Sequence, residues 1–525
     1  MDMFGGLTKT SSRIAIAAAF GLMLGGFAFK ATPAQAADLG GDCCADLEER
    51  VAELEATTVR KGNKKVSVTL SGWVVKTLNF WDDEKIGSFF VGDKGYDLGT
   101  RFAITGSATI APGWSAGYNI TVNTWGDKFT TAGASLGLPA TGASNQFDEG
   151  GDSFGSINTL YSYIYIKSDT WGTVNWGHLS PASDNPAVLA DISGTVIETN
   201  AVWFEGASFF LRPKGTGVKG GYNSLSGAAW QDFIRCQGLG VGLGTDCFGA
   251  AQPAIRYDSP TWGGFRFETS YGTQEAINPM INVPLGLPAS INTPDSHFWD
   301  IAGFYTGDWN SIKLSVAAAY TWMETGALSS LFAVPNANCR TFFGDEDFDV
   351  GCGNNADLFQ IGASIMHKPS GLGIYGMYQL EDGGYRVFDV VANDGSLRSS
   401  PETDAWYLKP FWRKAWSPIG ATVLYGEYGQ YNDQFIATSA NVAGQFAFPV
   451  TWGFDLAQIT GSEVERYGLG VVQEIDSAAM HLWLRWQHQE IDVNLLARDF
   501  GNSAVRVNQS YDDWDLFQAG GVIFF

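Results

Sequence analysis

Residues 312 to 322 read IKLSVAAAYTW, and the side chains along this stretch alternate in character. The even positions, from Ile312 to Trp322, are apolar and mostly large. The odd positions hold Lys313, Ser315, Thr321 and two alanines. A period of two predicts a β-strand with one apolar face and one face of small or polar residues.

The same alternation recurs at residues 98–110 and 114–122. Segments of about ten to thirteen residues are long for a globular strand but suit a tilted membrane crossing. A soluble β-sandwich would also alternate, so this pattern leaves two fold classes open.

The connections between the alternating segments favour a membrane barrel. Short and long connections alternate along the chain, as expected when short turns lie on one side of a membrane and long loops on the other. The short ones are 112–113, 169–171, 261–263, 307–310, 369–371 and 416–418. The long ones are 81–96, 126–155, 180–203, 225–251, 274–296, 323–356, 382–403, 429–462 and 490–510.

Five of the short turns carry a tryptophan, namely Trp114, Trp171, Trp262, Trp309 and Trp416. An indole ring settles at the headgroup level of a bilayer, so these residues predict an interfacial girdle.

The predicted fold is all-β, a transmembrane antiparallel β-barrel of 16–18 strands with an aqueous lumen and a short periplasmic N-terminal coiled-coil helix. The eighteen segments are 66–80, 97–111, 114–125, 156–168, 172–179, 204–213, 216–224, 252–260, 263–273, 297–306, 310–323, 356–368, 372–381, 403–414, 419–429, 463–476, 477–490 and 511–525. The weakest pair is 204–213 with 216–224, and without this hairpin the barrel has sixteen strands.

The N-terminal residues predict export. Lys9 and Arg13 precede an apolar run at 14–29, and an Ala-Gln-Ala pattern follows at 34–36. The run is short for a spanning helix, so residues 1–36 are interpreted as a signal peptide. Residues 37–62 then form the periplasmic helix, and residues 63–525 form the barrel.

The predicted helix at 37–62 has an apolar seam at 3-4-3-4 spacing, formed by Cys44, Leu47, Val51, Leu54 and Thr58. Two heptads are too few to associate alone, but copies tethered to an oligomeric barrel would meet at high effective concentration. The alternatives are a parallel coiled coil, with an interchain disulfide at Cys44, and a lone amphipathic helix on a periplasmic surface.

Several stretches resemble the alphaproteobacterial (Rhizobiales-type) outer-membrane porin family. They are AADLGGDCCADLEERVAELEATT at 36–58, KVSVTLSGWV at 65–74, DLGTRFAITG at 97–106 and the terminal Phe525. The resemblance implies a homotrimer of water-filled channels in the outer membrane, in contact with its lipid and lipopolysaccharide. It also implies passive diffusion of small hydrophilic solutes and ions. The start of the mature chain further resembles barrels tethered to peptidoglycan.

The connection at 180–203 carries Asp184, Asp191 and Glu198 and no basic residue. In general porins the loop after the fifth strand narrows the barrel, so these acids are predicted to line a constriction. An ordinary acidic surface loop is the alternative.

Basic residues on the small and polar face are predicted to line the opposite wall of the pore, where a transverse field would favour cations. They are Arg101, Arg256, Arg266, Lys313, Lys409, Arg466 and Arg485. The alternative is that they are merely solvated charges. Trp483, Tyr407 and Phe411 share this face and raise a second hypothesis, a sugar-specific channel with an aromatic stacking track.

Six cysteines in an oxidising compartment suggest disulfides, and local pairing gives Cys236–Cys247 and Cys339–Cys352, with cross-loop pairing as the alternative. The five histidines show no catalytic or metal-binding spacing, so the sequence predicts no enzyme, no cofactor and no metal. A net charge of −23 makes nucleic acid a poor partner. A barrel serving mainly as an envelope tether remains a third hypothesis.

Overall fold

The computed structural model describes most of the predicted barrel region. The described residues are 66–85, 87–92, 94, 99–125, 156–201, 206, 209, 211, 212, 214, 230, 233, 234, 245, 251–273, 297–324, 355–382, 386–388, 397–399, 402–434, 454–499 and 503–525. The predicted signal peptide, the N-terminal helix with its seam and all six cysteines lie outside them.

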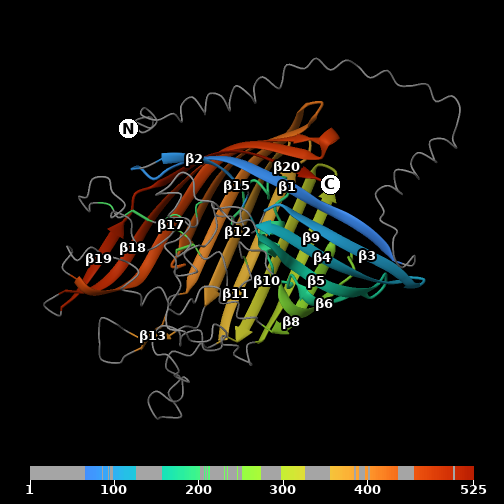
Figure 1. The fold of residues 1–525 in the computed structure, drawn as a ribbon, viewed down its shortest axis with the longest axis horizontal. Coiled ribbons are helices and arrows are strands. Elements are labelled where there is room, and N and C mark those ends of the chain that lie inside the picture. Colours follow the sequence, from blue (N-terminus) through green and yellow to red (C-terminus); the bar gives the residue numbers. More distant parts are fainter. Residues whose placement is uncertain are drawn as a thin grey trace, which may run out of the picture.

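The described chain is almost entirely β-structure (Figure 1). Its strands are β1 (Ser67–Asp82), β2 (Gly87–Gly92), β3 (Arg101–Ala111), β4 (Trp114–Trp125), β5 (Ser156–Ser168), β6 (Gly172–Leu179), β7 (Gln252–Asp258), β8 (Phe265–Thr273), β9 (His297–Trp309), β10 (Ile312–Glu324), β11 (Asn355–His367), β12 (Leu372–Asp382), β13 (Arg386–Phe388), β14 (Leu397–Ser399), β15 (Thr403–Ser417), β16 (Gly420–Asn432), β17 (Phe454–Ile475), β18 (Met480–Asp499), β19 (Ala504–Ser510) and β20 (Trp514–Phe524). The described helical turns are α5 (Pro186–Leu189) and a 3-10 turn, η8 (Asp476–Ala478). No helix among the described residues is long and apolar enough to cross a membrane.

Antiparallel neighbours close the sheet into a barrel. β1 pairs with β3 on one side, from Ser67↔Ser107 to Trp73↔Arg101, and with β20 on the other, from Trp73↔Phe524 to Asp82↔Asp515. Figure 1 shows β1 beside β20 at this closure. Of the 18 strands in the sheet, β2 and β19 only extend the pairing beyond the ends of β3 and β20, and the other 16 form the ring.

The sixteen-strand alternative of the sequence prediction is therefore confirmed, and the count of eighteen is wrong. β6 pairs directly with β7, from Thr173↔Asp258 to Leu179↔Gln252, which leaves no place in the wall for a hairpin at 204–224. The described residues of 204–213 form no strand, and 216–224 lie outside the described residues.

The rhythm of short and long connections is confirmed. Short turns join β3 to β4, β5 to β6, β7 to β8, β9 to β10, β11 to β12, β15 to β16 and β17 to β18. The five turn tryptophans are exposed, with fractions from 44% for Trp114 to 71% for Trp171. A ring of exposed indoles at one end of the barrel is what an interfacial girdle requires.

β10 shows the two faces that its sequence predicts. Ser315, Ala317, Ala319 and Thr321 are buried on the inner side, and the larger apolar side chains between them are only partly buried. Elsewhere the outer face carries exposed apolar residues, such as Leu70 and Val74 of β1 and Ile365 and Ile374 of β11 and β12. This outer surface suits lipid.

Candidate functional site

Residues 180–201 run along the inside of the barrel rather than over its rim, and hydrogen bonds to side chains of the wall hold this loop in place. The Ser183 amide donates to Asp300 Oδ2 of β9 at 2.8 Å, and Gln360 Nε2 of β11 donates to the Ser183 carbonyl at 2.7 Å. Farther along, Lys409 of β15 donates to the Thr199 carbonyl at 2.8 Å. The predicted inward fold of this loop therefore matches its position among the inner faces of β9, β11 and β15.

The turn α5 places the loop against the wall by close backbone approach. Asn185 adopts a left-handed conformation (φ 62°) before Pro186, which begins the turn. A Cβ on Gly362 of β11 would lie 2.0 Å from the Ala187 carbonyl oxygen, so only glycine admits the loop here. The Tyr375 hydroxyl donates to the same oxygen at 2.9 Å.

Small side chains on the wall make room for the rest of the loop. Ala182 clusters with Ala302 of β9 and Ala319 of β10, each at most 3% exposed. Ala317 and Ala319 of IKLSVAAAYTW are therefore packing positions beneath the loop, which is why this face of β10 is small as well as polar.

Asp191 forms a buried ion pair with the wall. Its Oδ2 lies 2.6 Å from Lys409 Nζ, and both side chains are 0% exposed. Lys409 also donates to Thr195 Oγ1 at 2.9 Å. The prediction placed Asp191 at the lumen opposite a basic wall; the structure instead joins acid and base directly.

Glu198 is likewise turned toward the wall. Its side chain is fully buried, and its Oε1 lies 3.0 Å from Nδ1 of His481 in β18. Lys94 reaches into the barrel and donates to the Glu198 carbonyl at 2.8 Å. Glu198 therefore fastens the loop and does not face solvent in the lumen.

Asp184 is the one predicted constriction acid that is only half-buried. Its carboxylate accepts a hydrogen bond from Ser180 Oγ at 2.5 Å and one from Asn185 Nδ2 at 2.9 Å. Desolvation raises the pKa of this carboxyl to about 7, against the lowering effects of the Ser180 hydrogen bond and of the positive charges of Arg256 and Arg101. The charge of Asp184 is thus adjustable near neutral pH.

The predicted basic wall residues are mostly paired with acids. Arg256 Nε lies 2.7 Å from Asp258 Oδ1, and Arg266 forms an ion pair with Glu268. Arg256 also donates to the Ser180 carbonyl at 2.7 Å, where the loop begins.

A buried polar group on β15 to β17 holds the far end of the loop. Glu427 accepts hydrogen bonds from Thr199 Oγ1 at 2.7 Å and from the Tyr407 hydroxyl at 2.6 Å, and it lies 3.8 Å from Arg466 Nη2. Arg466 donates to the Asn200 carbonyl. Glu427 is not among the residues predicted to line the pore, although its inward register between Tyr425 and Gly429 was a usable signal.

The other three predicted bases occupy different surroundings. Arg101 lies over the Trp73 ring at 4.7 Å. Arg485 donates to Gln518 Oε1 at 3.0 Å, and Lys313 is exposed on the inner face of β10. These residues do not form one continuous basic strip opposite the loop.

The aromatic track of the sugar-channel hypothesis is not accessible. Trp483, Tyr407 and Phe411 point inward as predicted, but they are only 1%, 0% and 3% exposed. A sugar stacks on an exposed ring face, so these three rings form no track in this structure.

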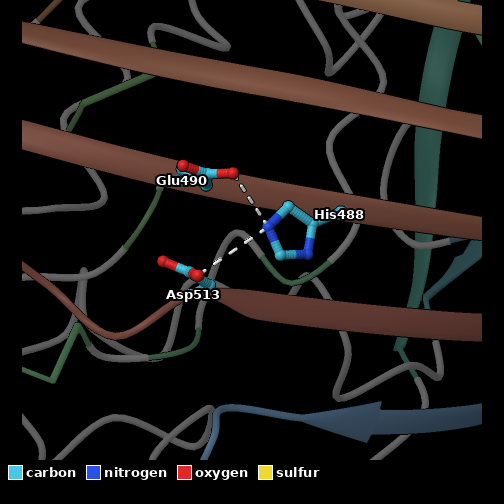
Figure 2. A group of neighbouring side chains, drawn as sticks. All are labelled: His488, Glu490 and Asp513. Atoms are coloured by element: carbon cyan, nitrogen blue, oxygen red, sulfur yellow. Dashed lines mark hydrogen bonds and ion pairs between the residues drawn. The ribbon is translucent and has the colours of Figure 1, made fainter. Parts of the chain in front are cut away.

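One group of described side chains, shown in Figure 2, is close enough to hold a metal ion. Its members His488 and Glu490 belong to the outward register of β18, because the residues that alternate with them are buried. His488 Nε2 is 3.2 Å from Glu490 Oε1 and 3.9 Å from Asp513 Oδ2, while Nδ1 is 2.9 Å from Asp515 Oδ1. Each ring nitrogen thus already has a carboxylate partner. The group marks where the outer face of β18 changes from apolar to charged.

Comparison with known proteins places these features in a family. The family model described as Gram-negative porin matches residues 16–475. No curated protein matches the chain.

Several solved structures resemble the barrel. An anion-selective porin from Comamonas acidovorans is 14% identical, with a TM-score of 0.44 over 88% of this chain and 100% of that one. OprB of Pseudomonas putida is 10% identical, with a TM-score of 0.47 over 91% and 97%. OmpF of Salmonella typhi, in complex with daunomycin, is 13% identical, with a TM-score of 0.44 over 89% and 100%. Likeness at this level says nothing about which solutes this chain admits.

Proposed function

The chain belongs to the Gram-negative porin family, and we propose that the loop at 180–203 sets the width and the cation preference of its channel. As a member of this family, the protein is a non-enzymatic β-barrel channel of the outer membrane through which small hydrophilic solutes and ions diffuse. The observation that carries the proposal is the position of the loop inside the barrel, held by β9, β11 and β15. A peptide segment fixed there reduces the cross-section that a solute can use.

Charge pairing supports a cation preference centred on Asp184. Asp191 and Glu198 are buried against Lys409 and His481, so their charges are compensated within the protein. Asp184 is the acid of the loop that is partly exposed as a residue. The chain as a whole carries 55 acidic against 32 basic residues, which adds a negative potential to the approach of ions.

Reversal potentials in planar bilayers under a salt gradient test this proposal. Asp184→Asn should lower the permeability of cations relative to anions. The matched control is Asp191→Leu with Lys409→Met, which replaces both members of a buried pair by apolar side chains without changing net charge and should leave the ratio in place. An unchanged ratio in Asp184→Asn would exclude this carboxylate as the selectivity determinant, and absence of conductance in the unmodified protein would exclude the channel itself.

The assembly is proposed to be a homotrimer in contact with outer-membrane lipid and lipopolysaccharide. The seam at Cys44, Leu47, Val51, Leu54 and Thr58 supports a periplasmic coiled coil, and the mature N-terminus is proposed to reach peptidoglycan. Deletion of residues 40–58 should weaken the trimer on mild-detergent gels and leave conductance intact. An equally stable trimer after this deletion would remove the proposed role of the helix.

A further inference from the structure

One part of the inner wall is apolar, although a porin lumen is expected to be polar. On β18, Ile491, Val493 and Leu495 are at most 4% exposed, while Asp492 and Asn494 between them are exposed. The apolar row therefore faces inward at this height. Ile491 pairs across with Val464 of β17, and Val464 is also fully buried.

The same strand has the opposite polarity nearer its short turn. There Leu482, Leu484 and Trp486 alternate with buried Trp483, Arg485 and Gln487. Because the apolar face swaps sides near His488, the upper part of β18 stands clear of the lipid and packs its apolar side chains inside the barrel.

The described apolar residues between 206 and 234 pack in the same buried cluster as this inner wall. Phe209 is fully buried between Trp81 of β1, at 4.7 Å between ring centroids, and Trp514 of β20, at 5.5 Å. Gly206 has φ +77°, and a Cβ there would lie 2.6 Å from the Trp514 ring. Both the conformation and the close approach require glycine.

Farther along the same connection, three more apolar side chains join the cluster. Trp230, Phe233 and Ile234 are at most 2% exposed and belong to one buried cluster with Val493 and Leu495. The Trp230 amide donates to the Phe209 carbonyl at 3.1 Å, which ties the two parts of the segment together.

Polar contacts fasten the segment to the barrel rim. Arg212 Nε lies 2.5 Å from Asp83 Oδ2, with side chains 3% and 5% exposed. The Asp512 amide donates to the Arg212 carbonyl at 2.7 Å, and the Lys214 amide donates to the Ser510 carbonyl at 2.9 Å. Asp83 and Asp512 flank the ends of β1 and β20 opposite the short turns, so the segment lies at the long-loop mouth.

We propose that the part of the β6–β7 connection around Phe209, Arg212 and Trp230, which follows the 180–203 loop in the same connection, forms a second narrowing of the channel. It occupies the β17, β18 and β20 side of the extracellular mouth and directs solutes along the opposite wall. It thereby excludes bulky hydrophilic solutes on the outer side of the membrane, before they reach the first constriction. This inference rests on the channel function of the family.

The position of the segment predicts an asymmetric channel. Neutral polyethylene glycols of graded mass, added to one side of a planar bilayer, reduce conductance only if they enter the mouth on that side. In the unmodified protein the largest polymer that enters should be smaller from the long-loop mouth than from the short-turn mouth. Phe209→Ala with Arg212→Gln should shift the long-loop limit to larger polymers and bring the two limits together.

Asn494→Ala is the matched control, because this side chain lies at the same height on the outer face of β18. In this variant the polymer size limit at the long-loop mouth should stay below the limit at the short-turn mouth. Heat-modifiable migration on gels verifies that the barrel of each variant is folded. Gly206→Ala is a second variant, which disturbs the contact with Trp514 through one added methyl group.

Equal limits from both sides in the unmodified protein, or an unchanged asymmetry in folded Phe209→Ala with Arg212→Gln, would overturn the second narrowing. Either result leaves the channel function standing, since that function is tested by the conductance itself.

Discussion

Lys409→Met should release the 180–203 loop from the wall while the barrel stays folded. The substitution keeps the length of the side chain but removes the ammonium group. Lys409 Nζ has three partners, Asp191 Oδ2 at 2.6 Å, Thr195 Oγ1 at 2.9 Å and the Thr199 carbonyl at 2.8 Å. All three belong to the loop, so the loss falls on the loop and not on the strand ladder.

The size of the effect follows from burial. The Asp191 side chain is 0% exposed, and removing one partner of a buried ion pair costs about 3–5 kcal/mol because the other charge stays buried and unpaired. At about 1.4 kcal/mol per factor of ten, local opening of the loop should become more frequent by about two to four orders of magnitude. The barrel keeps its ladder of backbone hydrogen bonds between β15, β12 and β16.

Hydrogen–deuterium exchange of the folded protein measures this opening directly. Amides such as that of Ala187, which donates to Gln360 Oε1, should exchange faster in Lys409→Met, and those of β10 and β11 should not. Lys313→Met is the matched control, because Lys313 is also basic and on the inner face but exposed. Adding Asp191→Leu should restore slow exchange, since replacing both partners of a buried pair by apolar residues is often neutral.

Two results would refute this reasoning. If loop amides exchange equally slowly in Lys409→Met and in the unmodified protein, the ion pair does not hold the loop. If the amides of the strands lose their protection from exchange together with those of the loop, the ion pair stabilises the whole barrel. The loop is then not an independent unit.

A change of pH and two further variants probe other parts of the barrel. Lowering the pH from about 8 to about 6 crosses the raised pKa of about 7 of Asp184, so protonation removes its charge and cation preference should fall; Asp184→Asn should show no such fall in reversal potential. Gly362→Val would place a Cβ 2.0 Å from the Ala187 carbonyl oxygen, so the loop must move and the conductance should change, whereas an unaltered current would contradict the close approach. Trp171→Ala removes an indole that is 71% exposed at a turn, and it should slow insertion of the refolded barrel into lipid vesicles; equal insertion rates would argue against an interfacial role.

The strands were predictable because their pattern is local. The predicted segment 310–323 agrees with β10 (Ile312–Glu324), and 172–179 agrees with β6 (Gly172–Leu179). In both, alternation on a lipid-facing surface repeats every second residue, so a short window contains the whole signal. The inward fold of the 180–203 loop was also anticipated, but through the resemblance to porins and not through its own residues.

The orientation of the loop acids was not predictable in this way. Lys409 and Thr195 are 214 positions apart in the chain, and nothing in the local sequence of either says that they meet. The resemblance to porins suggested acids facing a lumen, and the alternation of the strands suggested bases on the opposite wall. The structure joins Asp191 and Lys409 in one buried pair. Where the dielectric is low, this arrangement avoids two isolated charges.

β18 shows which part of a strand can be predicted from side-chain alternation and which part cannot. The predicted strand 477–490 ends near His488, where the lipid-facing apolar pattern ends, whereas β18 continues to Asp499. Past that point the apolar residues Ile491, Val493 and Leu495 occupy the other face. A change of face without a change of period indicates that a strand leaves the lipid while its inner side gains an apolar cover. The pattern thus predicts that a cover exists, and only the fold identifies it as the segment that carries Phe209.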